Sequence, residues 1–429
     1  MRTTSLSGLL LLLASRASAD FQRPQRPLSV DLADEAANRR PQTSAPPYRD
    51  DLLALHRGLV ETASVTGTEA DVGAWLVDYL RQRNYTAVRQ AVQPRESGQK
   101  RFNVVAWMGG SSEDDLSWSS SSSSSFALPP SRVLVTSHID VVPPHIGYAI
   151  DDAGDAITSK TAIRGRGSVD AKGSVAAQLT AVEALRRAGR VGPGDLALLY
   201  VVGEEDGGDG MVAFSASLSP SFAFQSAIFG EPTENRLACG HKGILGCTVT
   251  ARGRAGHSGY PWLGRSANEL LLRGLLAVVD TDLGSSPLYG ATTVNIGRMA
   301  GGVAANVIPA DATAHIAIRV ATAPQADGHE RVRTRLTDAL RSVDPDPNHL
   351  DVTCGHGYGV VECNCHVEGF QTMVANYGTD IPGLAGNHTR YLYGPGSILV
   401  AHSDHETLTV GDLEEAVEGY KTLIEHALQ

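Results

Sequence analysis

Apolar residues recur along the chain at two spacings, one helical and one extended. Leucine, valine and aromatic residues recur at helical spacing over residues 51–82, 175–185, 267–279 and 413–428. Short apolar runs occur at residues 103–107, 132–136, 196–202 and 227–229. Continuous apolar runs of this length are typical of buried strands. Strands that alternate with helices predict an α/β fold, in which a mostly parallel sheet carries helices on both faces.

The pattern changes beyond residue 243. Apolar and polar residues alternate over residues 247–251 and 315–320, as expected of half-exposed strands, and a helical segment lies between them. We therefore predict a smaller two-layer α/β domain of residues 244–352. It interrupts a larger domain, whose two parts are residues 48–243 and 353–429.

The N-terminus has the features of a secretory signal peptide. Arg2 precedes an apolar stretch centred on residues 9–13, and Ala17-Ser18-Ala19 forms a small-residue cleavage site. A buried N-terminal helix is the alternative. We expect residues 1–19 to be removed and the protein to be secreted. Residues 20–47, which are rich in proline, arginine and glutamine, are predicted to form a flexible arm or a propeptide.

Composition and short motifs narrow the possible functions. The 47 acidic and 36 basic residues give a net charge of −11, which disfavours binding to nucleic acid phosphates. No apolar run reaches the roughly 18 residues of a membrane span, so we expect none. The chain has no G-x-S-x-G elbow and no P-loop, which leaves a serine hydrolase or a nucleotide-binding protein without support. Sequons at Asn84 and Asn387 indicate glycosylation.

The five cysteines are too few for a disulfide scaffold. In an oxidising compartment four of them can pair, which leaves one thiol free. Cys239 with Cys247 is a candidate pair across a hairpin. Cys363 and Cys365 are too close to bridge each other easily, so either one could instead reach Cys354.

The candidate metal ligands share one feature, since each follows an apolar strand or opens a glycine-rich turn. They are His138, Asp170, Glu205, Glu231 and His402, with Glu204 directly before Glu205. The carboxyl ends of parallel strands meet at one edge of a sheet, where ligands bind. Buried carboxylates repel one another unless a cation is present, and imidazole with carboxylate suits zinc or a similar divalent ion. Asp140 is placed to fix the tautomer of His138.

In this order, the motifs of the chain resemble those of the M20 family of metallopeptidases. That family includes glutamate carboxypeptidases, aminoacylases, acetylornithine deacetylase and succinyl-diaminopimelate desuccinylase. The motifs are SHIDVV at 137–142, GSVDAKG at 167–173, GEE at 203–205, GEPT at 230–233, GRAGHS at 253–258, GGVAANVIP at 301–309 and AHSD at 401–404.

The resemblance implies a centre of two Zn²⁺ ions per subunit, for which Co²⁺ or Mn²⁺ could substitute. His138 and Glu205 are then ligands to different ions, and Asp170 bridges both. Glu231 and His402 supply the remaining ligands, one on each ion.

The resemblance also implies the roles of four further residues. Glu204 is the general base that activates a water between the metal ions, and His257 stabilises the oxyanion. Asn306 holds the substrate carbonyl, and Arg319 holds a free carboxylate. On its residue pattern alone, Arg319 could equally form an ion pair on a strand surface.

The function implied is that of a secreted zinc carboxypeptidase, which cleaves amide bonds next to a free carboxylate. An aminoacylase-like deacylase of N-acyl amino acids is the alternative, because the same site would cut either substrate. A non-catalytic secreted binding protein of the same fold is a remote alternative, since every ligand position and the base are filled. The resemblance is also consistent with a homodimer that forms through the inserted domain, which would act as a lid.

Overall fold

The computed structural model describes residues 45–95, 98–109, 117–118, 128–151, 154 and 156–429. The predicted signal peptide, and the predicted arm as far as residue 44, lie outside the described residues and stay predictions. Residues 46–429 form one compact unit. No helix in the described ranges has the length and apolar character needed to cross a membrane.

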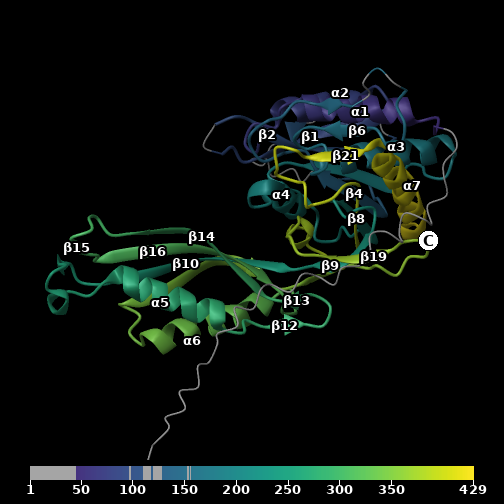
Figure 1. Cartoon of the computed structure of the whole chain (residues 1–429). Coiled ribbons are helices and arrows are strands. Elements are labelled where there is room, and N and C mark those ends of the chain that lie inside the picture. The colour runs from purple at the N-terminus through teal and green to yellow at the C-terminus, as the bar shows by residue number, and fades with distance from the viewer. Residues whose placement is uncertain (1–44, 96–97, 110–116, 119–127, 152–153, 155) are drawn as a thin grey trace, which may run out of the picture. The chain divides into compact units, whose positions relative to one another are not determined.

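The larger sheet joins seven strands in the order β20-β8-β4-β7-β2-β1-β3. Figure 1 labels four of them, β8, β4, β2 and β1. The first four of these, from β20 to β7, are parallel, whereas β2 runs antiparallel to both β7 and β1. The bounds are β1 Tyr85–Val92, β2 Arg101–Met108, β3 Ser117–Trp118, β4 Val133–His138, β7 Leu196–Val201, β8 Ser226–Gly230 and β20 Thr389–Tyr393. The predicted α/β fold is therefore confirmed.

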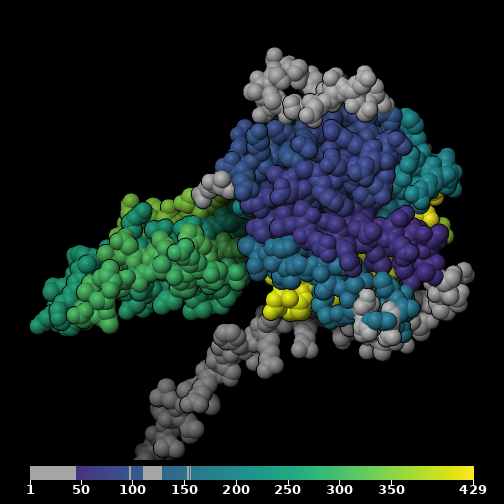
Figure 2. Space-filling view, turned by 90° about the horizontal axis from the view of Figure 1, so that it is seen from above, coloured from purple at the N-terminus to yellow at the C-terminus, as the bar shows by residue number. Residues whose placement is uncertain are grey.

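Helices cover both faces of this sheet. Four of them pack on one face: α1 Arg49–Glu61, α2 Ala70–Arg81, α3 Lys172–Arg187 and α7 Val410–Ala427. Val133 and Val135 of β4 point toward these helices, and Leu134 packs on the other face with Phe214 of α4, Asp209–Ser217. This alternation follows from the two-residue period of a strand. In the space-filling view, the N-terminal helices and the strands that follow them form one continuous purple and blue surface (Figure 2).

A second sheet has four antiparallel strands in the order β14-β16-β10-β17. Its bounds are β10 Gly243–Arg252, β14 Thr293–Gly301, β16 Asp311–Val320 and β17 Leu350–Tyr358. Two helices, α5 Ala267–Asp280 and α6 Gly328–Val343, pack on it around a separate apolar core. The predicted domain start, residue 244, is the second residue of β10, and the predicted end, residue 352, lies inside β17. Leu350, Val352 and Cys354 alternate with polar or glycine residues, but the glycine-rich second half of β17 carries no apolar signal for where the strand ends.

Short elements complete the described chain. Two three-stranded sheets are formed by β9 Leu237–His241, β18 Val361–Glu362 and β19 Thr372–Ala375, and by β5 Ala149–Ile150, β6 Ala162–Arg164 and β21 Thr407–Thr409. Two-stranded pairs are β11 Gly256–His257 with β15 Val307–Ile308, and β12 Ser285–Ser286 with β13 Gly290–Ala291.

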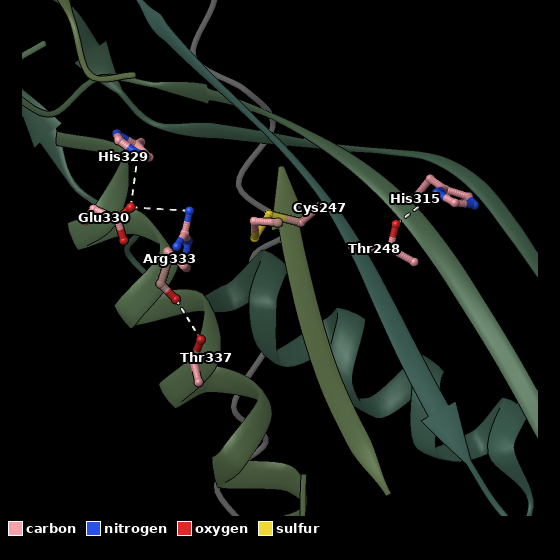
Figure 3. Close-up of a disulfide and its surroundings, with 8 residues drawn as sticks. Cys247, Thr248, His315, His329, Glu330, Arg333 and Thr337 are labelled. Atoms are coloured by element: carbon pink, nitrogen blue, oxygen red, sulfur yellow. Dashed lines mark hydrogen bonds and ion pairs between the residues drawn. A yellow bond between two sulfur atoms is a disulfide. The ribbon is translucent and has the colours of Figure 1, made fainter. Parts of the chain in front are cut away.

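Two disulfides form, but not between the candidate partners. Cys247 bonds to Cys354 across the neighbouring strands β10 and β17, and Cys239 bonds to Cys365, while Cys363 is free. The expected hairpin pair of Cys239 and Cys247 is wrong because β9 and β10 belong to different sheets. Figure 3 shows the disulfide at Cys247. It also shows the hydrogen bond between Thr248 and His315, whose side chains lie on the exposed face of the same sheet.

We predict that the double substitution Cys247→Ala with Cys354→Ala lowers the free energy of unfolding by about 2–4 kcal/mol, since it removes a crosslink between distant chain segments. Chemical denaturation would measure this loss. The matched control is Cys363→Ala, which removes a thiol but no crosslink and is expected to cost less. Equal losses in the two variants would contradict the assigned pairing.

Candidate metal centre

Three neighbouring parallel strands bring the predicted ligands to one edge of the larger sheet. His138 is the last residue of β4 and Glu231 directly follows β8. Glu204 and Glu205 lie in a 3₁₀ turn that begins three residues after the end of β7. Because the strands are parallel and adjacent, these side chains emerge at the same edge. Asp170 arrives there from the start of α3.

The carboxylate of Asp170 lies between two imidazoles. Its Oδ1 is 3.1 Å from Nε2 of His138, and its Oδ2 is 3.2 Å from Nε2 of His402. Each imidazole also faces a second carboxylate: Nε2 of His138 is 3.9 Å from Glu231, and Nε2 of His402 is 2.8 Å from Glu205. A carboxylate that bridges two cations would lie in this way.

The donor set can be grouped by distance. The ligand atoms of His138, Glu204 and Glu231 all lie within 4.8 Å of one another, as do those of Asp170, Glu205 and His402. Oε1 of Glu205 is buried and has no hydrogen-bond partner among the residues the structure describes. Buried carboxylate oxygens need a hydrogen-bond donor or a cation. The unpartnered oxygen and the mixture of imidazole and carboxylate donors therefore fit a pair of divalent cations.

The charges of this cluster are strongly perturbed. Burial and the neighbouring charge of Glu231 raise the pKa of the Glu204 carboxyl well above its usual range. Burial also raises the pKa of Glu231. Hydrogen bonds to Asp170 and Glu205 raise the pKa of the His402 imidazole to about 10. Without metal, these raised pKa values favour bound protons, which reduce the repulsion among the carboxylates. Bound cations would reduce the same repulsion.

Asp140 orients both a ligand and the turn that carries the base. Nδ1 of His138 lies 3.0 Å from the backbone oxygen of Asp140 and 3.6 Å from its carboxylate, so the carbonyl is the nearer partner. A proton on Nδ1 leaves the lone pair of Nε2 facing Asp170. The Asp140 carboxylate accepts hydrogen bonds from the backbone N–H groups of Glu204 and Glu205, at 3.2 and 3.3 Å, and from the Thr66 hydroxyl at 2.7 Å.

Two polar residues of β2 make buried hydrogen bonds next to the turn that carries Glu204. Arg101, whose side chain is fully buried, donates to Glu69 at 2.8 Å and to Asp209 at 2.7 Å. Asn103 accepts a hydrogen bond from the backbone N–H of Val202 at 3.1 Å, directly before the turn. The first residue of the turn, Gly203, has a φ of 78°, which favours glycine.

A cavity of about 500 Å³ is lined by Glu204 and by four of the candidate ligands, Asp170, Glu205, Glu231 and His402. Arg319 of β16 lines it together with Ile244 of β10 and Tyr358 of β17, so the ends of the second sheet form one wall. The structure thus brings Arg319 to the same cavity as Glu204, although the role of Arg319 stays a prediction. The lining also includes Val212, His356, Tyr377, Gly378, Asp380, Pro382 and Ile398.

His257 and Asn306 do not line this cavity. They lie near each other where β11 pairs with β15, and the backbone N–H of Ser258 donates to the backbone oxygen of Asn306 at 3.0 Å. Both side chains are exposed. Their predicted catalytic and substrate-binding roles therefore stay predictions. Asn84 and Asn387 are also exposed, as glycosylation requires.

The sequence did not reveal several of the residues around the cavity. Asp380 is buried there, and burial raises the pKa of its carboxyl to about 7. His356 lies within β17, and Tyr377 and Asp380 follow the four-residue strand β19. That strand is too short to stand out in the sequence, so the tertiary structure identifies these residues. His388, which lies outside the cavity, is also buried, and burial lowers its pKa to about 4.

This fold and this cluster of side chains are typical of metal-dependent α/β hydrolases. Residues 239–347 match the family described as the peptidase dimerisation domain. A peptidase M20 domain-containing protein of Sordaria macrospora is 53% identical over 90% of this chain and 86% of its own length. A probable carboxypeptidase of Aspergillus flavus is 43% identical over 99% of each chain. The chain belongs to the M20 peptidase family, and it is a hydrolase of the metallopeptidase type.

Solved structures show the same fold at lower identity. A tripeptidase from Staphylococcus aureus has a TM-score of 0.67 at 19% identity, covering 89% of this chain and 98% of its own. An M20 family metallo-carboxypeptidase from Sulfolobus solfataricus has a TM-score of 0.65 at 15% identity, covering 88% of this chain and 99% of its own.

We expect Gly203→Ala to destabilise the protein more than Gly290→Ala. Both glycines have a positive φ, of 78° and 68°, which costs other residues about 1–2 kcal/mol. A Cβ at Gly203 would also collide with Asp209 and lie 2.5 Å from Nη2 of Arg101, whereas one at Gly290 meets nothing within 4 Å. Chemical denaturation of both variants measures the difference. Equal losses would contradict the close packing of the Glu204 turn.

Proposed function

We propose that this protein is a secreted carboxypeptidase that uses two zinc ions to hydrolyse the amide bond next to a free carboxylate. The observation that carries the proposal is the Asp170 carboxylate, which lies between the imidazoles of His138 and His402. The carboxypeptidase names of its relatives support the reaction class. Zinc is the proposed ion because two imidazoles and several carboxylates are ligands that it prefers, and Co²⁺ or Mn²⁺ would serve as substitutes.

The first cation site would be held by His138, Asp170 and Glu231, and the second by Asp170, Glu205 and His402. Bound there, the ions would supply a water of lowered pKa and polarise the scissile carbonyl. Glu204 lines the same cavity, so its carboxylate can take a proton from the attacking water. The water oxygen bonds to the carbonyl carbon, the C–N bond breaks, and Glu204 passes the proton to the leaving amine.

Arg319 supports recognition of a free carboxylate. Its guanidinium reaches the cavity from the end of β16, and guanidinium groups bind carboxylates through two parallel hydrogen bonds. A substrate held in this way would place the amide nearest its C-terminal carboxylate over the cation sites. An N-acyl amino acid carries the same amide and carboxylate, so deacylase activity is a defined outcome of the assay below.

A homodimer and a secreted location complete the proposal. The match of residues 239–347 to the peptidase dimerisation domain supports a dimer, as does the exposed apolar face of α5 at Leu272, Leu276 and Val279. His257 lies outside the cavity, so in this proposal a second subunit supplies it. The disulfides at Cys247 and Cys239 support an oxidising compartment.

We expect chelation to abolish hydrolysis and added zinc to restore it. With zinc present, Glu204→Gln should retain its metal but lose about 10²–10⁴-fold in kcat, because only the proton acceptor is removed. Dipeptides and N-acetyl amino acids form the substrate panel, and metal content is measured in parallel.

The matched control for this variant is Glu362→Gln, an exposed residue of β18 outside the cavity, which should behave as the wild-type protein does. Full activity of the metal-free protein, or normal turnover by Glu204→Gln, would contradict the mechanism. Preference for N-acetyl amino acids over dipeptides would replace the carboxypeptidase assignment with a deacylase.

For Arg319→Met, kcat/KM on peptides with a free C-terminus should fall by about 10–100-fold, the value of a lost charged hydrogen-bonded contact of ~1.5–3 kcal/mol. Peptides with an amidated C-terminus should be poor substrates of the wild-type protein. For these peptides, Arg319→Met should lower kcat/KM little further. Steady-state kinetics on matched free and amidated peptides tests this. Equal wild-type rates on the two forms would remove the role of Arg319.

A further inference from the structure

A buried carboxylate outside the ligand set contacts the loop that carries Asp170. Glu406 is 2% exposed, and its Oε1 accepts three backbone N–H groups. These belong to Gly167 at 3.0 Å, Val169 at 3.0 Å and Asp170 itself at 3.2 Å. One oxygen atom therefore fixes the backbone from Gly167 up to the proposed bridging ligand, Asp170.

The second oxygen of Glu406 connects this loop to another ligand. Oε2 accepts a hydrogen bond from Nη1 of Arg166 at 2.7 Å, and the two side chains are 1% and 2% exposed. Nη2 of Arg166 donates to the backbone oxygen of His402 at 3.2 Å. The ion pair thus contacts the backbone of Asp170 and of His402, which together with Glu205 would hold the second cation.

The backbone of His402 needs such support. Its φ is 64°, a region that residues with a side chain rarely adopt. Strands β6 and β21 pair antiparallel, with Arg164 opposite Thr407, which sets Arg166 beside Glu406. Residues held in an unusual conformation persist only where the surroundings determine them, and here the Arg166 bond to the His402 carbonyl contributes.

We propose that Arg166 and Glu406 form a positioning pair that sets the spacing between Asp170 and His402, and through it the affinity of the second cation site. The proposal rests on the proposed function, because it needs the cluster to bind metal. It assigns no chemical step to the pair, since neither residue lines the central cavity. Its bonds end on the ligand residues themselves, so its loss should change metal affinity beyond any change in stability.

The test compares zinc affinity in two variants that each neutralise a buried glutamate. Glu406→Gln keeps the size of the side chain but loses the charge that faces Arg166. The matched control is Glu414→Gln in α7, because Glu414 also pairs with an arginine, Arg49, at 3.0 Å and contacts no ligand residue. Competition with a chromogenic chelator gives the zinc affinity, and denaturation of the metal-free proteins gives the stability.

We expect Glu406→Gln to bind the more weakly held zinc about 10–100-fold less tightly, as is typical when a residue that supports a ligand is lost. Saturating zinc should restore its hydrolytic rate, and Glu414→Gln should bind zinc as the wild-type protein does. Wild-type affinity in Glu406→Gln, or equal losses in both variants, would overturn the proposal. If Glu406→Gln fails to fold, Arg166→Lys decides, because it keeps the charge but cannot hold both partners.

The two proposals fail in different ways. A wild-type protein that binds no zinc would overturn the proposed function, and the role of the pair with it. A wild-type protein that binds two zinc ions, with unchanged affinity in Glu406→Gln and Arg166→Lys, would overturn the positioning role alone.

Discussion

Negative charge confined to one edge of a sheet is the constraint on which the rest of this structure depends. Asp170, Glu204, Glu205 and Glu231 meet where three parallel strands end. Two like charges about 4 Å apart repel by about 4 kcal/mol at an effective dielectric constant of about 20. The protein alone meets this cost with protons, as the raised pKa values of Glu204 and His402 show. Bound divalent cations would reduce this repulsion further.

Such a cluster needs a rigid frame, and the frame is built from groups that never enter the cavity. Asp140 holds the turn of Glu204 through two backbone N–H groups, and Arg101 and Asn103 support that turn from β2. The pair of Arg166 and Glu406 holds the segments of the opposite ligands. The carboxylates of Asp140 and Glu406 bond mainly to backbone N–H groups, which fixes ligand positions without adding charge to the cavity.

The sequence predicted the parts of this architecture that depend on local patterns. His138, Glu205 and Glu231 could be found because each follows an apolar strand, and the ends of parallel strands converge. The helix α6 was not predicted, although its buried residues Val332, Leu336, Ala339 and Leu340 recur at helical spacing, so this signal was present in the sequence. Tyr358 ends β17 and Asp380 follows the short strand β19, but the apolar pattern of both strands is weak in the sequence. The disulfide partners depend on which sheet each strand joins. His257 and Asn306 were grouped with the ligands by resemblance, yet they lie outside the cavity.

The decisive measurement of the paired cation sites is anomalous diffraction at the zinc absorption edge, from crystals of the protein grown with zinc. We expect two peaks, each within ligand distance of one Asp170 oxygen, the first also within ligand distance of His138 and the second of His402. A map with no peak in this cluster, or with a single peak that leaves Asp170 unligated, would contradict it.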